Sequence, residues 1–134
     1  MADFKAISEY ETIPATIASG TVIEAGDLVE LDTGIVIKAT ATAAAVAFAP
    51  QGSADGETEI EISKGYVELV GTGDAVFANS YKGTEVDLSG STNLKIDVTG
   101  GTTYKVLLIA SSTDAGTVDS ADDIKVFINK PITF

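Results

Sequence analysis

Apolar and polar residues alternate along several short segments of this chain. The alternation is clearest between Glu57 and Ser63, where three glutamates fall on one face of an extended segment and two isoleucines on the other. A period of two is typical of a β-strand with one face buried. The same pattern predicts further strands whose inward residues are Ile60 and Ile62, Val86 and Leu88, Leu94, Ile96 and Val98, and Ile124, Val126 and Ile128, with Glu85 and Asp87 facing outward.

One segment is apolar without alternation. Five consecutive apolar residues run from Val106 to Ala110, between Gly100-Gly101 and Ser111-Ser112. Periodicity alone does not separate a buried strand from a buried helix here, but the short length and the large aliphatic residues favour a strand. We predict a central strand that is buried on both faces and that shares one core with the alternating strands.

Turn residues separate these segments. Leu28–Asp32 and Ile35–Ala39 flank Asp32-Thr33-Gly34 and predict a β-hairpin with a short loop. The alanine-rich stretch that follows predicts a turn and then a strand over Ala45–Ala49, with one helical turn over 41–45 as the alternative. Short strands at roughly 8–12 residue spacing are the pattern of a sandwich or barrel. We therefore predict an all-β fold, a single-domain β-sandwich or β-barrel of short antiparallel strands.

The first residues differ from the rest. Residues 1–18 contain no glycine and alternate only weakly, and Pro14 argues against a continuous helix. We predict an extended N-terminal arm over 1–18 and a β domain over 19–134. The arm is expected to pair with a sheet edge of a neighbouring subunit or partner, and the domain to be stable without it. The candidate partner-binding residues are Phe4, Ile7, Tyr10 and Ile13.

Charge narrows the choice of partners. The chain of 134 residues carries 20 acidic residues, 8 lysines and a formal net charge of -12. Nucleic acid binding needs a basic surface, and anionic membrane surfaces repel an acidic protein, so no nucleic acid and no membrane partner is expected. The start of the chain lacks the pattern of a signal peptide. We expect a protein that is synthesised in a host cytoplasm.

Catalytic chemistry is poorly supplied. The chain has no histidine and no cysteine, so the commonest general base and the strongest nucleophile are absent. Asp114–Asp123 holds four carboxylates in ten residues, but their spacing does not match a calcium-binding EF-hand loop. A solvated turn explains them better. We expect no enzyme activity, no catalytic residue, no cofactor and no metal.

The order of strands and turns over most of Thr21 to Ile128 carries a family resemblance. It rests on short segments, which are Ile23–Val29, the hairpin up to Thr40, Tyr81–Leu88, Leu94–Val98, Asp114–Thr117 and Asp122–Ile128. With these segments the chain resembles the small capsid decoration proteins of tailed bacteriophages. The resemblance implies a β-rich protein that binds the outer surface of the mature capsid and stabilises it. It transfers no individual binding residue.

The same resemblance implies the partners and the location. The major capsid protein would be the partner, and the outer capsid surface of the virion the location. Such proteins are often trimers at three-fold positions, whereas others are monomers at hexamer centres, so a homo-oligomer is expected with a trimer favoured. An acidic protein is accommodated more easily outside the shell than next to packaged, anionic DNA.

Two other functions are compatible with the sequence. One is a tail-tube or other virion β protein. The other is a small secreted or surface β-sandwich binding module, for example for carbohydrate, which an exposed aromatic platform would favour. An enzyme ranks third.

Overall fold

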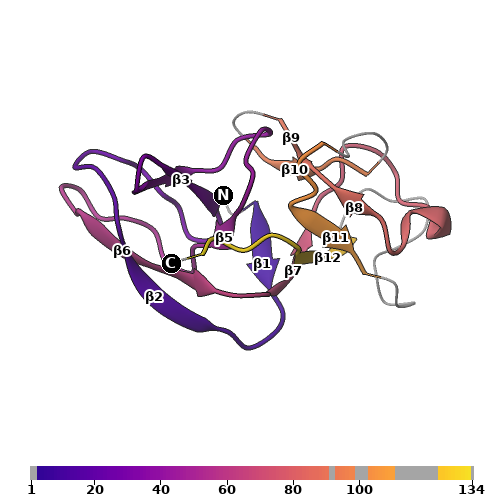
Figure 1. Cartoon of the computed structure of the whole chain (residues 1–134), viewed down its shortest axis with the longest axis horizontal. Coiled ribbons are helices and arrows are strands. Elements are labelled where there is room, and N and C mark those ends of the chain that lie inside the picture. Colours follow the sequence, from indigo (N-terminus) through magenta and orange to yellow (C-terminus); the bar gives the residue numbers. More distant parts are fainter. Residues whose placement is uncertain (1–2, 91–92, 99–102, 111–123, 134) are drawn as a thin grey trace.

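The computed structural model describes residues 3–90, 93–98, 103–110 and 124–133. Figure 1 shows an elongated body with β2, β3 and β6 at one end and β8 to β12 at the other. A short 3-10 helix spans Asn79–Tyr81. The strands are β1 (Phe4–Ala6), β2 (Glu11–Thr16), β3 (Leu28–Asp32), β4 (Ile35–Lys38), β5 (Ala47–Phe48), β6 (Glu59–Lys64), β7 (Glu68–Gly71), β8 (Glu85–Val86), β9 (Leu88–Ser89), β10 (Lys95–Ile96), β11 (Leu107–Ile109) and β12 (Ile124–Ile128).

Antiparallel pairing joins all of these strands, which confirms the predicted all-β class. Within the described residues the largest sheet has five strands in the order β1-β7-β12-β11-β8. Three smaller sheets accompany it, formed by β10-β9, by β2-β6 and by β4-β3-β5. The predicted hairpin is present as β3 and β4, and Thr33 and Gly34 both take positive φ (52° and 84°) in its loop. Two positive φ values are typical of the tight turns that match strand twist.

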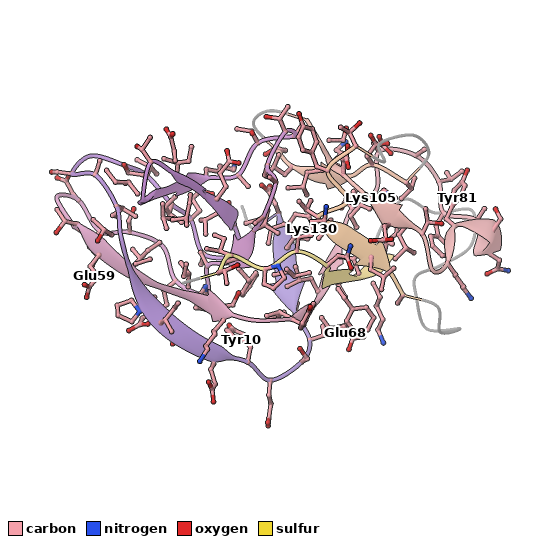
Figure 2. All side chains as sticks on the ribbon, in the orientation of Figure 1. Tyr10, Glu59, Glu68, Tyr81, Lys105 and Lys130 are labelled. Carbon is pink, nitrogen blue, oxygen red and sulfur yellow. The ribbon has the colours of Figure 1, made fainter. Side chains whose placement is uncertain are left out.

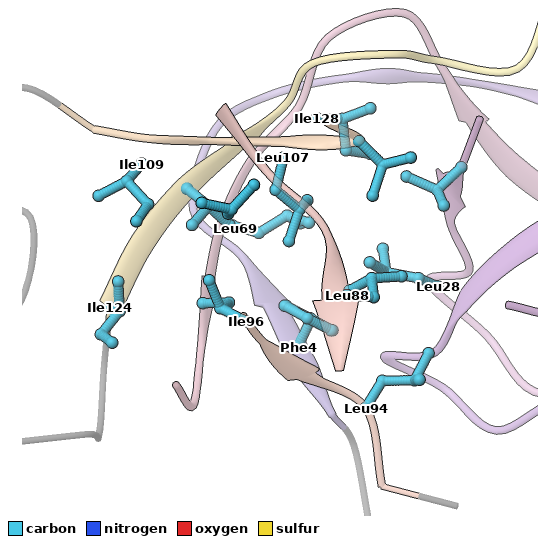
Figure 3. Close-up of a cluster of buried hydrophobic side chains, with 14 of the residues drawn as sticks. Phe4, Leu28, Leu69, Leu88, Leu94, Ile96, Leu107, Ile109, Ile124 and Ile128 are labelled. Carbon is cyan, nitrogen blue, oxygen red and sulfur yellow. The ribbon is translucent and has the colours of Figure 1, made fainter. Parts of the chain in front are cut away.

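Buried apolar side chains form two clusters. The larger one lies under the five-stranded sheet, where Leu69, Leu107, Ile109, Ile124 and Ile128 meet side chains from β9 and β10 (Figure 3). The smaller cluster lies between β2-β6 and β4-β3-β5, and Ile60 and Ile62 belong to it. The inward residues were thus predicted correctly, but the prediction of one shared core was wrong. Periodicity identifies a buried face and does not identify what covers that face.

The predicted central strand needs a similar correction. Leu107 and Ile109 of β11 are fully buried, but Leu108 between them is only half-buried. One face of this strand therefore points into the core and the other lies near the surface. The middle strand of the sheet is β12, whose Ile124, Val126 and Ile128 are fully buried.

Asp87 interrupts the alternation at a point that the sequence did not indicate. It was predicted to face outward, but it is buried between β8 and β9. Its carboxylate accepts hydrogen bonds from three successive backbone N–H groups, those of Thr103 (3.2 Å), Tyr104 (2.7 Å) and Lys105 (2.7 Å). These bonds compensate for the loss of water around the charge. Asp87 thus fixes the chain just before β11.

The N-terminal residues form one long ladder with a distant segment. β1 pairs with β7 from Phe4 opposite Gly71, and β2 pairs with β6 from Glu11 opposite Lys64 to Thr16 opposite Glu59. In every opposed pair of both parts, the two residue numbers add up to the same total. The register is therefore unchanged from one part to the other. Between the two parts the Glu68 N–H turns to the Ser8 side-chain oxygen, at 3.0 Å. A single two-stranded ribbon therefore crosses both cores.

Phe4 fills a site that Gly71 leaves open. Phe4 is only 2% exposed and belongs to the larger core. A Cβ atom at Gly71 would lie 2.5 Å from the Phe4 ring, so only glycine leaves room for that ring opposite it. Residues 4–16 are extended, as predicted, but the edge with which they pair belongs to their own chain. Phe4, predicted as a partner contact, therefore packs into the core of its own chain. Because of this packing we now expect residues 4–16 to contribute to the stability of the body.

Removal of residues 1–14 tests this integration. We expect a variant that begins at Ala15 to be unfolded, because it lacks Phe4 in the larger core, leaves β7 without β1, and leaves most of β6 without β2. Circular dichroism should show the loss of strand signal and of the cooperative melting transition. A variant that melts cooperatively near the temperature of the full chain would contradict the integrated ladder.

A single substitution tests the Phe4 site. Phe4→Ala should lower the free energy of unfolding by about 3–5 kcal/mol, the usual cost of a large-to-small change in a core. Gly71→Ala should cost about 1–3 kcal/mol through overpacking against the same ring. The matched control is Ile7→Ala, three residues on in the same segment and 40% exposed, for which about 1 kcal/mol or less is expected. Equal losses for Phe4→Ala and Ile7→Ala in urea denaturation would argue against the site.

Candidate interaction surface

The four candidate partner-binding residues do not form one surface. Phe4 is buried, whereas Ile7 is 40% exposed and lies beside Glu68 at the edge of the five-stranded sheet. Tyr10 is half-buried and packs edge-on against Phe48, with the ring centroids 5.8 Å apart. Ile13 is half-buried against the smaller core. Figure 2 shows Tyr10 where the chain passes from β1 to β2. Two of the four, Phe4 and Tyr10, border the same surface depression.

That depression is here called the aromatic hollow. It has a volume of about 380 Å³, opens widely to solvent and is lined mainly by apolar atoms. Its size falls at the lower end of the range for ligand pockets. β1, the segment between β1 and β2, the turn before β3, and the end of β5 with the residues after it supply the lining, which is Phe4, Lys5, Ala6, Tyr10, Ala25, Gly26, Phe48 and Pro50. Sequence reasoning missed Phe48 and Pro50, although an aromatic side chain two residues before a proline is a signal that could have drawn attention to them.

The aromatic hollow lies beside an open strand edge. The Ile7 N–H donates to the Glu68 carbonyl at 2.9 Å, so alternation along the ladder turns the backbone groups of Phe4 and Ala6 away from β7. The Phe4 N–H uses this outward direction to reach the Gly26 carbonyl, at 3.0 Å. Among the residues that the structure describes, no hydrogen bond involves the outward N–H and C=O of Ala6. Such groups can pair with another strand.

A second depression lies at the other end of the segment. It has a volume of about 390 Å³ and is lined by Ile13, Lys64, Gly65, Pro131, Ile132 and Thr133. The last residues return to this region through a parallel bridge between Val46 and Pro131. Tyr66, next to Gly65, is 72% exposed. Ile13 thus faces surroundings different from those of Phe4 and Tyr10.

The negative charge is unevenly distributed. Residues 9–65 carry ten acidic residues and two lysines. Their net negative charge is twice the net negative charge of all the remaining residues together. Glu59 projects from β6 at the end of the body that β2, β3 and β6 form (Figure 2). Glu9 and Glu11, which precede and follow Tyr10 in the chain, are both exposed, although neither lines the aromatic hollow. The surface around this hollow therefore favours cationic groups.

A partly buried ion cluster holds the start of β1. The Lys38 Nζ lies 3.3 Å from the Asp3 Oδ2 and 3.7 Å from the Asp27 Oδ1. The Asp3 Oδ2 also accepts the Leu94 N–H at 3.2 Å, and the Asp27 Oδ2 accepts the Glu24 N–H at 2.9 Å. Asp27 is 1% exposed. Burial raises the pKa of Asp27 and outweighs the Glu24 hydrogen bond and the Lys38 charge, which lower it.

The raised pKa of Asp27 gives a pH dependence with a defined sign. The usual pKa of this carboxyl is 3.8, and the folded value is higher, so the folded state binds the proton more tightly. The resulting stabilisation is complete below the usual pKa and is lost as pH rises through the folded pKa. Asp27→Asn removes the titration and keeps an oxygen acceptor for the Glu24 N–H.

Urea denaturation of both proteins from about pH 3.5 to 8 measures this effect, since the window must span the usual aspartate pKa. We expect the free energy of unfolding of the wild type, relative to Asp27→Asn, to fall as pH rises. A difference between wild type and Asp27→Asn that stays constant or grows with pH would contradict the raised pKa.

The described residues offer little to a metal ion. No group of three or more acidic side chains in this part of the chain is arranged to hold one. The acidic stretch Asp114–Asp123, for which no calcium site was predicted, lies outside the described residues. Helices in the described ranges are too short or too polar to span a membrane.

Comparisons with protein-family models, with curated proteins and with solved structures find no match to this chain. The resemblance to capsid decoration proteins therefore rests on the strand and turn pattern alone.

Proposed function

We propose that this chain is a bacteriophage virion structural protein that binds the outer surface of the mature capsid and cements it. The major capsid protein is the partner in this proposal. A homo-oligomer, with a trimer favoured, is part of the same proposal. The supporting resemblance is the order of strands and turns over most of Thr21 to Ile128.

The observation that carries the proposal is the character of the surface. Two depressions lined mainly by apolar atoms lie along the N-terminal segment of a chain whose net charge is -12. Apolar depressions rimmed by polar groups are typical of protein contact sites. Such a surface supports a role in binding a protein partner, and its charge supports a site outside the shell, away from packaged DNA.

The energetics of cementing need no chemistry beyond binding. A protein that binds the mature shell but not its dissociated subunits stabilises the shell by mass action. At a free concentration of 100 times the Kd, each site contributes about 2.7 kcal/mol. Phe4 and Ile132, near the two ends of the described chain, both pack into its own cores. Such a body suits this role, because little ordering of these segments is left to be done on binding.

The direct test mixes purified protein with empty, expanded capsids of the virus that encodes the chain. We expect saturable binding, added density on the outer surface in electron cryomicroscopy, and a higher temperature of capsid disassembly. Unexpanded shells of the same virus are the matched control and should bind more weakly. Binding to isolated tail tubes instead, or no binding to expanded capsids, would contradict the proposal.

A further inference from the structure

We propose that the outer edge of β1 and the aromatic hollow together form an acceptor site for an extended, basic segment of a partner protein. The partner segment would add as a strand beside Ala6 and place an apolar side chain in the hollow. This inference does not depend on the proposed function, because it specifies the chemistry of the segment and not its source.

The backbone of β1 supplies the first part of the argument. At Phe4 the outward direction is already used by the bond to the Gly26 carbonyl, at 3.0 Å. Two residues later, at Ala6, the outward N–H and C=O have no partner among the described residues. The strand edge is therefore open at Ala6. An added strand would gain backbone hydrogen bonds from this point toward Ser8.

β2, which follows β1 on the same side of the ribbon, has the opposite property. The Ile17 N–H bonds to the Thr58 carbonyl at 2.9 Å, so the odd-numbered residues of β2 pair with β6 and Pro14 faces outward. Proline has no N–H to donate, and on an edge strand it blocks pairing with another chain. The ribbon is therefore closed to strand addition along β2 and open along β1.

Apolar contact supplies the second part. In strand addition, affinity comes from the main chain, and pockets for alternate side chains supply specificity. The aromatic hollow places Tyr10, Phe48 and Pro50 beside the open edge. Aromatic and proline side chains bury large areas with little loss of side-chain freedom. An apolar residue of the added strand would contact these three.

Charge selects the occupant. Glu9 and Glu11 are exposed on either side of Tyr10, and Lys5 is the one cationic residue in the lining. At this site, an acidic segment from a second copy of this chain, whose net charge is -12, would be repelled, so a homo-oligomer would have to use another surface. A segment with lysine or arginine next to its apolar residues would be attracted and steered to the site.

The probe is the peptide Lys-Val-Lys-Leu-Lys-Val-Lys, added to the full-length ¹⁵N-labelled protein. We expect saturable chemical-shift changes concentrated in residues 4–10, 25–26 and 48–50. The peptide Glu-Val-Glu-Leu-Glu-Val-Glu should not bind. Two further versions of the basic peptide carry N-methyl groups on alternate amides, one version on each of the two sets. They keep the charge but remove the N–H groups that would pair with β1. At least one version should therefore bind about tenfold more weakly, a loss of about 1.4 kcal/mol.

A pair of charge variants provides the matched control. The double substitution Glu9→Lys/Glu11→Lys should weaken binding at least about tenfold, whereas Glu59→Lys/Glu61→Lys changes the net charge equally on β6 and should have little effect. Shift changes spread over the acidic surface, equal losses in both double variants, or unchanged binding of both N-methylated peptides would overturn the proposal. Peptide binding without capsid binding would refute only the proposed function.

Discussion

The rest of the structure depends on the antiparallel pairing of β1 with β7 and of β2 with β6, which keeps one register across both pairs. This pairing joins the smaller core, which it covers with β2 and β6, to the larger core, which it enters through β1 and β7. The two segments are far apart in the sequence, so closing the loop between them carries an entropic cost. Burial of Phe4 opposite Gly71 and of Ala15 and Ile17 in the smaller core offsets that cost. Without the ribbon, each core would lose one of its walls.

Much of the fold follows from the alternation of residues. Ile60, Ile62 and the inward residues of β12 could be predicted because a period of two fixes which face of a strand is buried. The partners of those faces could not be predicted, since pairing is decided by contacts between distant segments. Phe4 illustrates the difference. Its weakly alternating surroundings indicated an extended segment, but nothing local indicated that Gly71 would leave room for its ring.

Asp87 and Asp27 show that the local sequence does not predict whether a charged side chain is buried. A carboxylate in an alternating strand or a turn is usually solvated, and Asp87 was predicted to face outward for this reason. Asp87 is buried because three N–H groups from residues 103–105 reach it, and Asp27 because Lys38 lies nearby. The aromatic hollow has the same origin, since Tyr10 and Phe48 meet only after the strands have paired. Of the predicted site, the sequence provided individual side chains and not their arrangement.

The strand order also constrains when the protein can fold during its synthesis. β12 lies in the middle of the five-stranded sheet, between β7 and β11, yet it is the last strand to leave the ribosome. Until Ile128 has been made, β7 with its partner β1 and β11 with its partner β8 are two separate ribbons with an unfilled gap between them. The larger core therefore closes only after translation has passed this point. Its long-range pairings place the chain among the slower-folding topologies, and its exposed intermediates are the stage at which a chaperone would act.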